Sequence, residues 1–359
     1  MARILIKNGR VWDGEKFFFS DVLILSDKIA EIAENIDDSL AEFVCDASGK
    51  IVSCGLVDAH MHIRGISPDL GVQPEVACMP FGVTSVVDAS ATYGSRTILD
   101  NALINGLVFV ACRVENNRAY FENTEKMLSE YGEYVAGVKL FFDTEGADVR
   151  DATALCDVID FAERHNLRVM VHSSNSPIPI PELLSHLRPG DIFTHAYHGG
   201  TNNSSEDDFE CIFEAKKRGV IIDAGLAGHI HTDFRVFRDA ISKGAIPDII
   251  STDLTILSSY KRGGKYGMTM CMNIARHLGM SEEDIFRAVT SNPAKALSKE
   301  DEWGYLKVGR RADVAIFELT DESTDATFDL TDKAGNHIFS DVGYRCVLTV
   351  ASGEVVYRR

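Results

Sequence analysis

Two histidines separated by one residue, His60 and His62, are the first residues in this chain whose spacing could support chemistry. They follow a run of apolar and β-branched residues that predicts a buried strand. Residues i and i+2 of a strand point to the same side, so two imidazoles placed in this way can bind one metal ion. His-x-His alone is a weak signal, and a structural or surface role for the pair is the alternative.

Metal-ligating residue types also stand at the ends of four later apolar runs: Lys139, His172, His195 and Asp253. Taken singly, each histidine could be a hydrogen-bonded core residue, and the aspartate could be a helix N-cap. Taken together, five strand ends that all carry such groups favour a single metal centre. In a barrel of parallel strands, the carboxyl ends of the strands meet at one face.

Lys139 has apolar neighbours, among them Val138, Leu140 and Phe141, and an ammonium group is costly there without a partner. One interpretation is a buried lysine paired with a carboxylate. The other is an amine whose pKa is lowered by burial and which reacts with carbon dioxide to form a carbamate. A carbamate is chemically a carboxylate, so it can bridge two cations.

The elements that must position these groups are eight short apolar runs with helix-like stretches between them. The runs are 51–59, 82–89, 107–114, 135–142, 168–172, 191–196, 220–224 and 247–252. The helix-like stretches include 151–166, 204–219 and 233–244, and the last two end in glycine, a helix C-terminal signal. This alternation predicts an α/β fold, a (β/α)8 barrel of the TIM type. A doubly wound open sheet is the competing architecture.

The two ends of the chain have a different pattern, with short strands and hairpin turns and no long helix. We expect residues 1–52 and 313–359 to form a small β-sandwich domain, and residues 53–312 to form the barrel. The segment 281–297 predicts a helix interrupted near Asn292 and Pro293.

Composition restricts the partners. The chain of 359 residues has 36 basic and 54 acidic residues, a net charge of -18, which argues against nucleic acid and anionic membranes. Its eight cysteines form no Cys-x-x-Cys pair, which is typical of reduced thiols in a cytoplasmic protein. The N-terminus interleaves charged and apolar residues, so we expect no signal peptide, and no apolar run approaches the length of a membrane span.

The segments GLVDAHMH, GVKLFF and STDL, with the two later histidines between them, resemble the amidohydrolase superfamily. They are most similar to its two-metal branch with a carboxylated lysine, which includes dihydroorotases, hydantoinases and D-aminoacylases. The tail, GMSEEDIFRAVTSNPAKAL followed by WGYLKVGRRADVAIFEL, is closest to a deacetylase-like subgroup. The resemblance covers essentially the whole chain.

The resemblance implies two divalent ions, with zinc as the expected ion. His60 and His62 would bind the buried ion, His172 and His195 the exposed one, and Lys139 carboxylated on its Nζ would bridge the two. Asp253 would bind the buried ion and would also be the catalytic proton shuttle for a metal-bridging hydroxide. The resemblance also implies a homo-oligomer.

Several residues are candidates for substrate binding. Arg64 resembles the arginine by which dihydroorotases hold a substrate carboxylate, although a structural salt bridge is the alternative. Arg113, Tyr197 and His198 are weaker pocket candidates. The second His-x-His pair, His229 and His231, follows the seventh strand outside the ligand order, and we interpret it as a loop near the pocket mouth.

Two positions depart from close relatives: Thr255 stands where a histidine is frequent, and residues 223–228 replace a Gly-His-Gly segment. The substrate therefore does not follow from the resemblance. The leading hypothesis is hydrolysis of an amide or ester in a small, carboxylate-bearing molecule, with a cyclic amide such as dihydroorotate as the alternative. A single-metal deaminase is disfavoured because such enzymes lack the strand-four lysine, and a non-catalytic scaffold because those proteins typically lose ligands.

Overall fold

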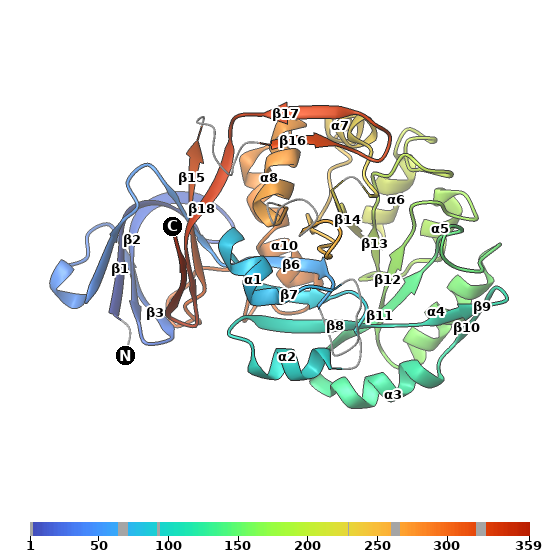
Figure 1. Cartoon of the computed structure of the whole chain (residues 1–359), viewed down its shortest axis with the longest axis horizontal. Coiled ribbons are helices and arrows are strands. Elements are labelled where there is room, and N and C mark those ends of the chain that lie inside the picture. The colour runs from blue at the N-terminus through green and yellow to red at the C-terminus, as the bar shows by residue number, and fades with distance from the viewer. Residues whose placement is uncertain (1–2, 64–70, 92–93, 229, 260–265, 321–327) are drawn as a thin grey trace.

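A curved parallel sheet forms the centre of the chain in the computed structural model, which describes residues 3–63, 71–91, 94–228, 230–259, 266–320 and 328–359 (Figure 1). Its seven strands follow one another around the sheet in chain order, as in a barrel. They are β6 (Leu56–Met61), β7 (Val83–Asp88), β8 (Asn105–Ala111), β11 (Val135–Phe141), β12 (Arg168–His172), β13 (Ile192–Thr194) and β14 (Ile221–Asp223).

The segment 249–254 closes this sheet into a barrel, in the place of an eighth strand. Ile249 forms a parallel bridge with Asp223 of β14, and Leu254 forms one with Met61 of β6. Backbone hydrogen bonds reinforce both seams, including Asp253 N to His60 O at 2.7 Å. The segment therefore joins β14, the last strand of this sheet, to β6, the first, and the predicted TIM-type barrel is confirmed.

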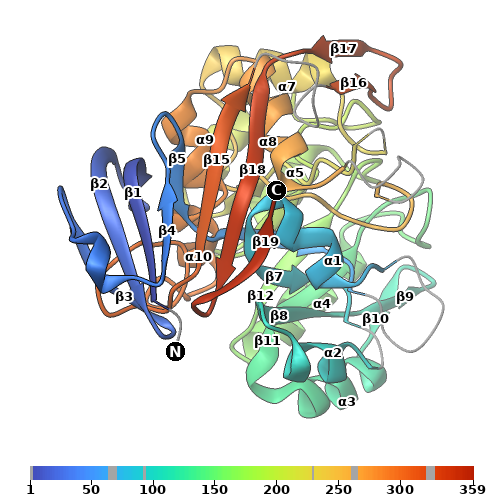
Figure 2. The same cartoon turned by 60° about the vertical axis from the view of Figure 1, so that its left-hand side comes forward.

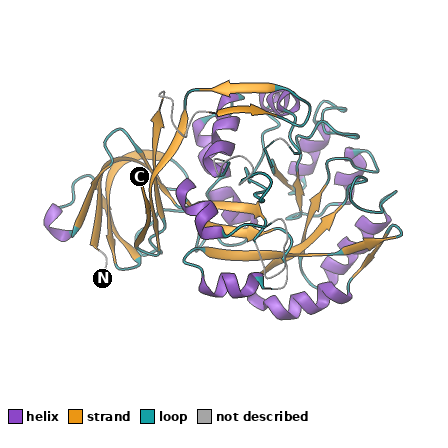
Figure 3. Cartoon of the chain, in the orientation of Figure 1, coloured by secondary structure: helices purple, strands orange, loops and turns teal. Residues whose placement is uncertain are grey.

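Helices lie along the outside of the curved sheet (Figure 3). Their apolar stripes explain this placement: α4, for example, buries Leu155, Val158 and Ala162 against the sheet side and exposes charged residues elsewhere. The helices are α1 (Pro74–Cys78), α2 (Ser95–Asn101), α3 (Glu122–Tyr131), α4 (Thr153–Arg164), α5 (Ile180–His186), α6 (Glu210–Lys217), α7 (Phe234–Lys243), α8 (Met268–His277), α9 (Glu282–Ala288) and α10 (Ser291–Ala296).

Two of the helix predictions need correction. The stretch 204–219 becomes helical only at Glu210, because Phe209 has a left-handed backbone (φ 66°) that ends the preceding turns. The stretch 281–297 breaks at Val289 and Thr290, earlier than predicted. Pro293 lies in the first turn of α10, where its missing N–H removes no intrahelical bond.

The two ends of the chain pair into one curved sheet beside the barrel (Figure 2). Its hydrogen-bonded order is β19-β18-β15-β5-β1-β2-β3, and β4 also pairs with β1. The strands are β1 (Arg3–Trp12), β2 (Phe17–Leu25), β3 (Lys28–Ala33), β4 (Phe43–Asp46), β5 (Ile51–Cys54), β15 (Val314–Thr320), β18 (Gly343–Ala351) and β19 (Glu354–Arg358). The N-terminal part ends at Cys54 and the C-terminal part begins at Val314.

A hairpin of β16 (Phe328–Thr331) and β17 (His337–Ser340) separates β15 from β18 in the chain. It leaves the terminal sheet and lies near α7 at the barrel (Figure 1). Its turn is tied to that helix, because Phe234 N donates to Asp332 Oδ2 at 2.6 Å. None of the described helices is both long and apolar enough to cross a bilayer.

Candidate metal centre

Five of the six predicted ligands line one cavity of about 280 Å³, and the sixth, His195, packs against His172. They lie at the carboxyl ends of their strands: His60 in β6, Lys139 in β11, His172 at the end of β12, His195 directly after β13, and Asp253 in the closing segment. The cavity is lined by His60, His62, Ser90, Ala111, Cys112, Lys139, Phe141, His172, Ile230, His231, Asp253, Thr255 and Leu257.

The first ligand cluster consists of His60, His62 and Asp253, whose ligand atoms all lie within 4.8 Å of one another. Asp253 Oδ1 lies 3.4 Å from His60 Nε2 and 3.0 Å from His62 Nε2. The strand period places both imidazoles on one side of β6, as the sequence predicts. The bond from Asp253 N to His60 O holds the carboxylate beside them.

A buried hydrogen-bond chain orients His60. Thr194 Oγ1 donates to Asp223 Oδ2 at 2.7 Å, so it accepts from His60 Nδ1 at 3.0 Å. This assigns the proton to Nδ1 and leaves the Nε2 lone pair directed at the cluster. Asp223 also accepts from Ser251 Oγ at 2.7 Å, which fixes its carboxylate in turn. Such partners behind a ligand set its tautomer and raise its metal affinity.

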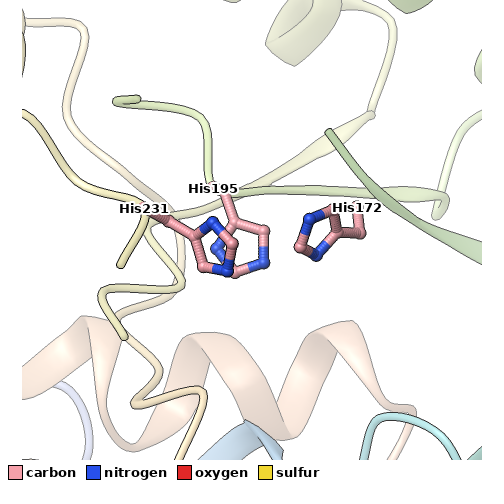
Figure 4. A group of neighbouring side chains, drawn as sticks. All are labelled: His172, His195 and His231. Atoms are coloured by element: carbon pink, nitrogen blue, oxygen red, sulfur yellow. The ribbon is translucent and has the colours of Figure 1, made fainter. Parts of the chain in front are cut away.

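The second cluster consists of His172, His195 and His231, and its ligand atoms also lie within 4.8 Å of one another (Figure 4). The three rings form a triangle, with centroids 4.3 Å apart for His172 and His195, 4.1 Å for His195 and His231, and 4.8 Å for His172 and His231. Three imidazoles at this separation can bind one borderline-soft cation such as zinc.

His195 is held in the tautomer that a ligand requires. Its Nδ1 donates to Gly225 O at 2.6 Å, so its Nε2 carries the lone pair. Gly225 has a positive φ of 49°, and a Cβ at that position would meet His195 Nδ1 at 2.7 Å. Gly225, in the segment 223–228 that replaces the Gly-His-Gly segment of relatives, therefore allows the ring of His195 to approach closely.

Asp253 joins the two clusters. Its Oδ1 faces His60 and His62, while its Oδ2 lies 3.9 Å from His195 Nε2 and 3.5 Å from His231 Nε2. Burial alone would raise the pKa of Asp253, but the neighbouring imidazoles lower it well below its usual range. Its backbone is left-handed (φ 47°), as is that of His195 (φ 64°), a strained conformation that clusters at functional sites.

Lys139 is buried, and its Nζ lies 3.3 Å from His60 Nε2. Burial lowers the pKa of Lys139 to about 8, against an opposing effect of Asp253 and Asp223. No carboxylate of the described residues forms an ion pair with its Nζ within 4.0 Å. The interpretation as a simple lysine–carboxylate pair is therefore not supported, and the side chain lies where it can reach the first cluster.

The second-cluster imidazoles are neutral at neutral pH, as ligands must be. Burial lowers the pKa of His172 to about 3 and that of His231 to about 4, and it lowers the pKa of His195 well below its usual value. Burial would also lower the pKa of His62, but its hydrogen bond to Asp253 raises it.

The substrate-binding candidates are not gathered at the cavity. Arg64 lies outside the described residues. Arg113, in β9 (Arg113–Glu115), is exposed and pairs with Glu115 at 2.5 Å. Tyr197 is buried, stacks on Phe237 and donates its hydroxyl to Ala245 O at 2.8 Å, so it is not free to bind substrate.

His198 is also buried, with Nδ1 accepting from Gly200 N at 3.1 Å, and it is not among the lining residues. The structure therefore does not bring Arg113, Tyr197 or His198 to the lining of this cavity. The side chains of residues that follow a strand can turn outward or into the core, and strand order alone does not distinguish these directions.

His231, which the sequence predicts in a loop near the pocket mouth, lies closer to the expected ligands than that prediction implies. It belongs to the second cluster and to the cavity lining, although it follows β14 in a loop. The His-x-His pattern was a signal for it, but the loop has no strand period from which its direction could be predicted. Its companion His229 lies outside the described residues. Thr255, which stands where relatives frequently have histidine, also lines the cavity.

The donor set fits divalent metal ions. His195 Nε2 is buried and has no hydrogen-bond partner among the described residues, so its lone pair is unsatisfied without a cation. Imidazole nitrogens with a carboxylate oxygen are ligands typical of zinc. The two clusters therefore can hold two ions about the shared carboxylate of Asp253.

Known proteins resemble this chain in sequence and in fold. The sequence model of the Amidohydrolase family matches residues 51–356. A deacetylase of Agrobacterium fabrum is 30% identical over 332 residues, which cover 86% of this chain and 80% of the deacetylase. A solved dihydroorotase has a TM-score of 0.85 and 26% identity, covering 99% of this chain and 98% of its own. A solved adenine deaminase has a TM-score of 0.86 and 24% identity over 100% of both chains, a likeness of fold.

Proposed function

The chain belongs to the amidohydrolase family. We propose that it hydrolyses a C–N amide bond or an ester bond in a small, carboxylate-bearing molecule. It would use two divalent metal ions for this reaction, and zinc is the ion that we expect. One observation supports this proposal above the others. Two ligand clusters share the carboxylate of Asp253, and the amine of Lys139 lies beside the first of them.

When bound, two divalent ions lower the pKa of a coordinated water and polarise the carbonyl that it attacks. His60, His62 and Asp253 would hold one ion, and His172 and His195 the other. Lys139, carboxylated on Nζ, would complete both sites, because a carbamate has two oxygens that can serve one ion each. The depressed pKa of Lys139, about 8, favours the neutral amine that carbon dioxide requires.

Asp253 would move the proton in this reaction. Its low pKa keeps it ionised, so it can accept the proton of the attacking water. As the oxygen–carbon bond forms and the carbon–nitrogen bond breaks, Asp253 would return that proton to the leaving nitrogen. The backbone bond to His60 O keeps its carboxylate between the clusters during both transfers.

The cavity favours a small substrate, since about 280 Å³ lies at the lower end of ligand sites. Phe141, Ile230 and Leu257 supply its apolar lining and would contact an acyl group or a ring. Arg64, which follows His62 by two residues, is proposed from its sequence position to bind the substrate carboxylate.

A cyclic amide hydrolase of the dihydroorotase type is the second candidate, and the similarity to a solved dihydroorotase favours it. A deaminase is less well supported, because the similarity to an adenine deaminase is one of fold and Lys139 lies in the cavity. A non-catalytic scaffold has no feature in its favour, since five of the six predicted ligands line the cavity and the sixth, His195, packs against His172 and His231. A homo-oligomeric state is part of the proposal and follows from the family resemblance alone.

The test is a hydrolysis screen of the zinc-loaded chain against N-acyl amino acids, O-acyl hydroxy acids and dihydroorotate. The number of bound ions is measured in parallel by elemental analysis. We expect two ions per chain and turnover of one of the three substrate classes. The Asp253→Asn chain is the control for contaminating hydrolases. Fewer than two ions, or turnover that persists in this control, would contradict the proposal.

A further inference from the structure

We infer that His231 is a third imidazole ligand of the second metal ion, so that this site is built from His172, His195 and His231. The inference rests on the proposed two-metal function. It adds a ligand from a loop that the strand order of the barrel does not supply. In the proposed function that site takes only His172, His195 and the carbamate of Lys139.

The positions of the three rings carry the inference. Their ligand atoms lie within 4.8 Å of one another, the same limit that holds for His60, His62 and Asp253. His231 is as close to His195 (4.1 Å between ring centroids) as His172 is (4.3 Å). A ligand set that includes His172 and His195 on geometric grounds therefore includes His231 on the same grounds.

The orientation of the His231 ring agrees with this role. Its Nδ1 lies 2.7 Å from Ser174 Oγ, a polar partner that also lies 3.4 Å from His172 Nε2. Its Nε2 faces inward and lies 3.5 Å from Asp253 Oδ2, the oxygen that also faces His195 Nε2. A histidine ligand typically has one nitrogen toward the metal and the other on a polar partner behind it. His231 therefore has the arrangement of a ligand already in place.

The loop that carries His231 is held by hydrogen bonds of the two residues that follow it. Thr232 Oγ1 donates to Leu226 O at 2.9 Å, and Asp233 N donates to Tyr197 O at 3.0 Å. Asp233 caps α7 by accepting from Arg235 N and Val236 N. These bonds fix the backbone on the C-terminal side of His231.

The hairpin of β16 and β17, which lies outside both the barrel and the terminal sheet, adds a second set of anchors. Asp332 is buried and accepts from Phe234 N at 2.6 Å, and Asn336 Nδ2 donates to Asp233 Oδ1 at 3.2 Å. Lys333 N donates to Thr232 O at 3.4 Å. Residues from outside the barrel therefore position the loop that supplies the third imidazole, which reduces the entropy lost when a metal ion binds.

Contact with the substrate is the competing role for His231, because its side chain is 16% exposed and lines the cavity. The two roles differ in a measurable way. A ligand determines how tightly the second ion binds in the absence of substrate, whereas a substrate contact changes KM and leaves metal affinity as it was.

The experiment compares zinc binding by the wild-type, His231→Gln, His172→Gln and His186→Gln chains. Zinc is titrated against a chromophoric chelator, and folding is checked by circular dichroism. His172→Gln is the reference for losing a ligand of the second site. His186→Gln, in helix α5 and away from the cavity lining, is the matched control for losing a histidine.

We expect two ions in the wild-type and control chains. In His231→Gln, the first ion should bind as before and the second about 100-fold more weakly or worse, since loss of outer partners alone costs 10- to 100-fold. Two ions of unchanged affinity in a folded His231→Gln chain would overturn the inference and leave the proposed function standing. A wild-type chain that binds fewer than two ions would overturn both.

If the His231→Gln chain does not fold, a zinc-loaded crystal structure of the wild-type chain tests whether His231 is a ligand. Anomalous scattering at the zinc edge locates the ions. A His231 nitrogen about 2.0–2.1 Å from an ion supports the inference, because this is the Zn–N bond length. A distance of more than about 3 Å overturns it, since no Zn–N bond is that long.

Discussion

Removal and return of the metal ions in buffer without carbon dioxide is the perturbation that bears most directly on Lys139. The proposed site needs a carbamate on this residue, and the carbamate forms only from the unprotonated amine. Stripping the ions with a chelator exposes that amine and allows the carbamate to decay. Return of activity after zinc is added should then depend on dissolved carbon dioxide.

The size of the pH effect follows from the pKa of Lys139, which burial lowers to about 8. At pH 7, about one such amine in ten is unprotonated, against about one in 3,000 for an ordinary lysine with a pKa of 10.5. The reactive fraction is thus about 300-fold larger than on the surface. Because the pKa is lowered, this fraction rises about tenfold per pH unit below 8 and levels off above it.

The assay measures the rate at which activity returns after zinc and a known concentration of dissolved carbon dioxide are added together. We expect an increase of about tenfold between pH 6 and pH 7 and little change between pH 9 and pH 10. Lys139→Ala should remain inactive, and acetate or propionate should partly restore it by supplying the missing carboxylate. Lys307→Gln, a change of an exposed lysine, is the control and should behave as the wild-type chain.

Two results would refute the reasoning about Lys139. One is full recovery of activity without carbon dioxide, which would show that activity does not require a carbamate on Lys139. The other is a Lys139→Ala chain as active as the wild type, which would remove the residue from the mechanism altogether. A recovery rate that keeps rising up to pH 10 would contradict the lowered pKa.

Three further substitutions test other parts of the site. Asp253→Asn should lower kcat by about 10²- to 10⁴-fold at saturating zinc, as expected for loss of a proton shuttle, and an unchanged kcat would exclude that role. Asp223→Asn weakens the chain that orients His60 and should raise the Kd of the first zinc ion about 10- to 100-fold by chelator competition; equal Kd values would show that Asp223 only supports the fold. Arg64→Met should raise KM for carboxylate-bearing substrates far more than for neutral analogues, and equal increases for both would remove the proposed carboxylate contact.

That the six expected ligands lie close together could be predicted from the sequence, because in a barrel the order of the strands determines where their ends lie. His60 and His62 share a face through the strand period, and the carboxyl ends of parallel strands always meet at one rim. Lys139, His172, His195 and Asp253 needed only to stand at strand ends in order to meet there. The hairpins of the terminal sheet could be predicted because they are local in sequence, whereas the pairing of β5 with β15 joins the two ends of the chain.

The directions of loop side chains could not be found in this way. Tyr197 and His198 follow the same strand as His195 by two and three residues, yet both are buried outside the cavity lining. His231 is brought to the second cluster by contacts of the two residues that follow Thr232. Asp233 N donates to Tyr197 O, and Phe234 N donates to Asp332, which lies 98 residues further along the chain in the hairpin of β16 and β17. Such long-range contacts have no local pattern from which they could be read.

The sequence by itself determined the barrel, the order of its strands and the chemistry of the rim, because strand periodicity and parallel pairing are regular. The tertiary structure decided which loop residues reach that rim. In the folded chain, His231 lies in the second cluster, and Thr194 and Asp223 orient the ring of His60. Tyr197 is buried in the core. Side chains in loops are directed by hydrogen bonds between segments far apart in the chain, and only the folded chain brings those segments together.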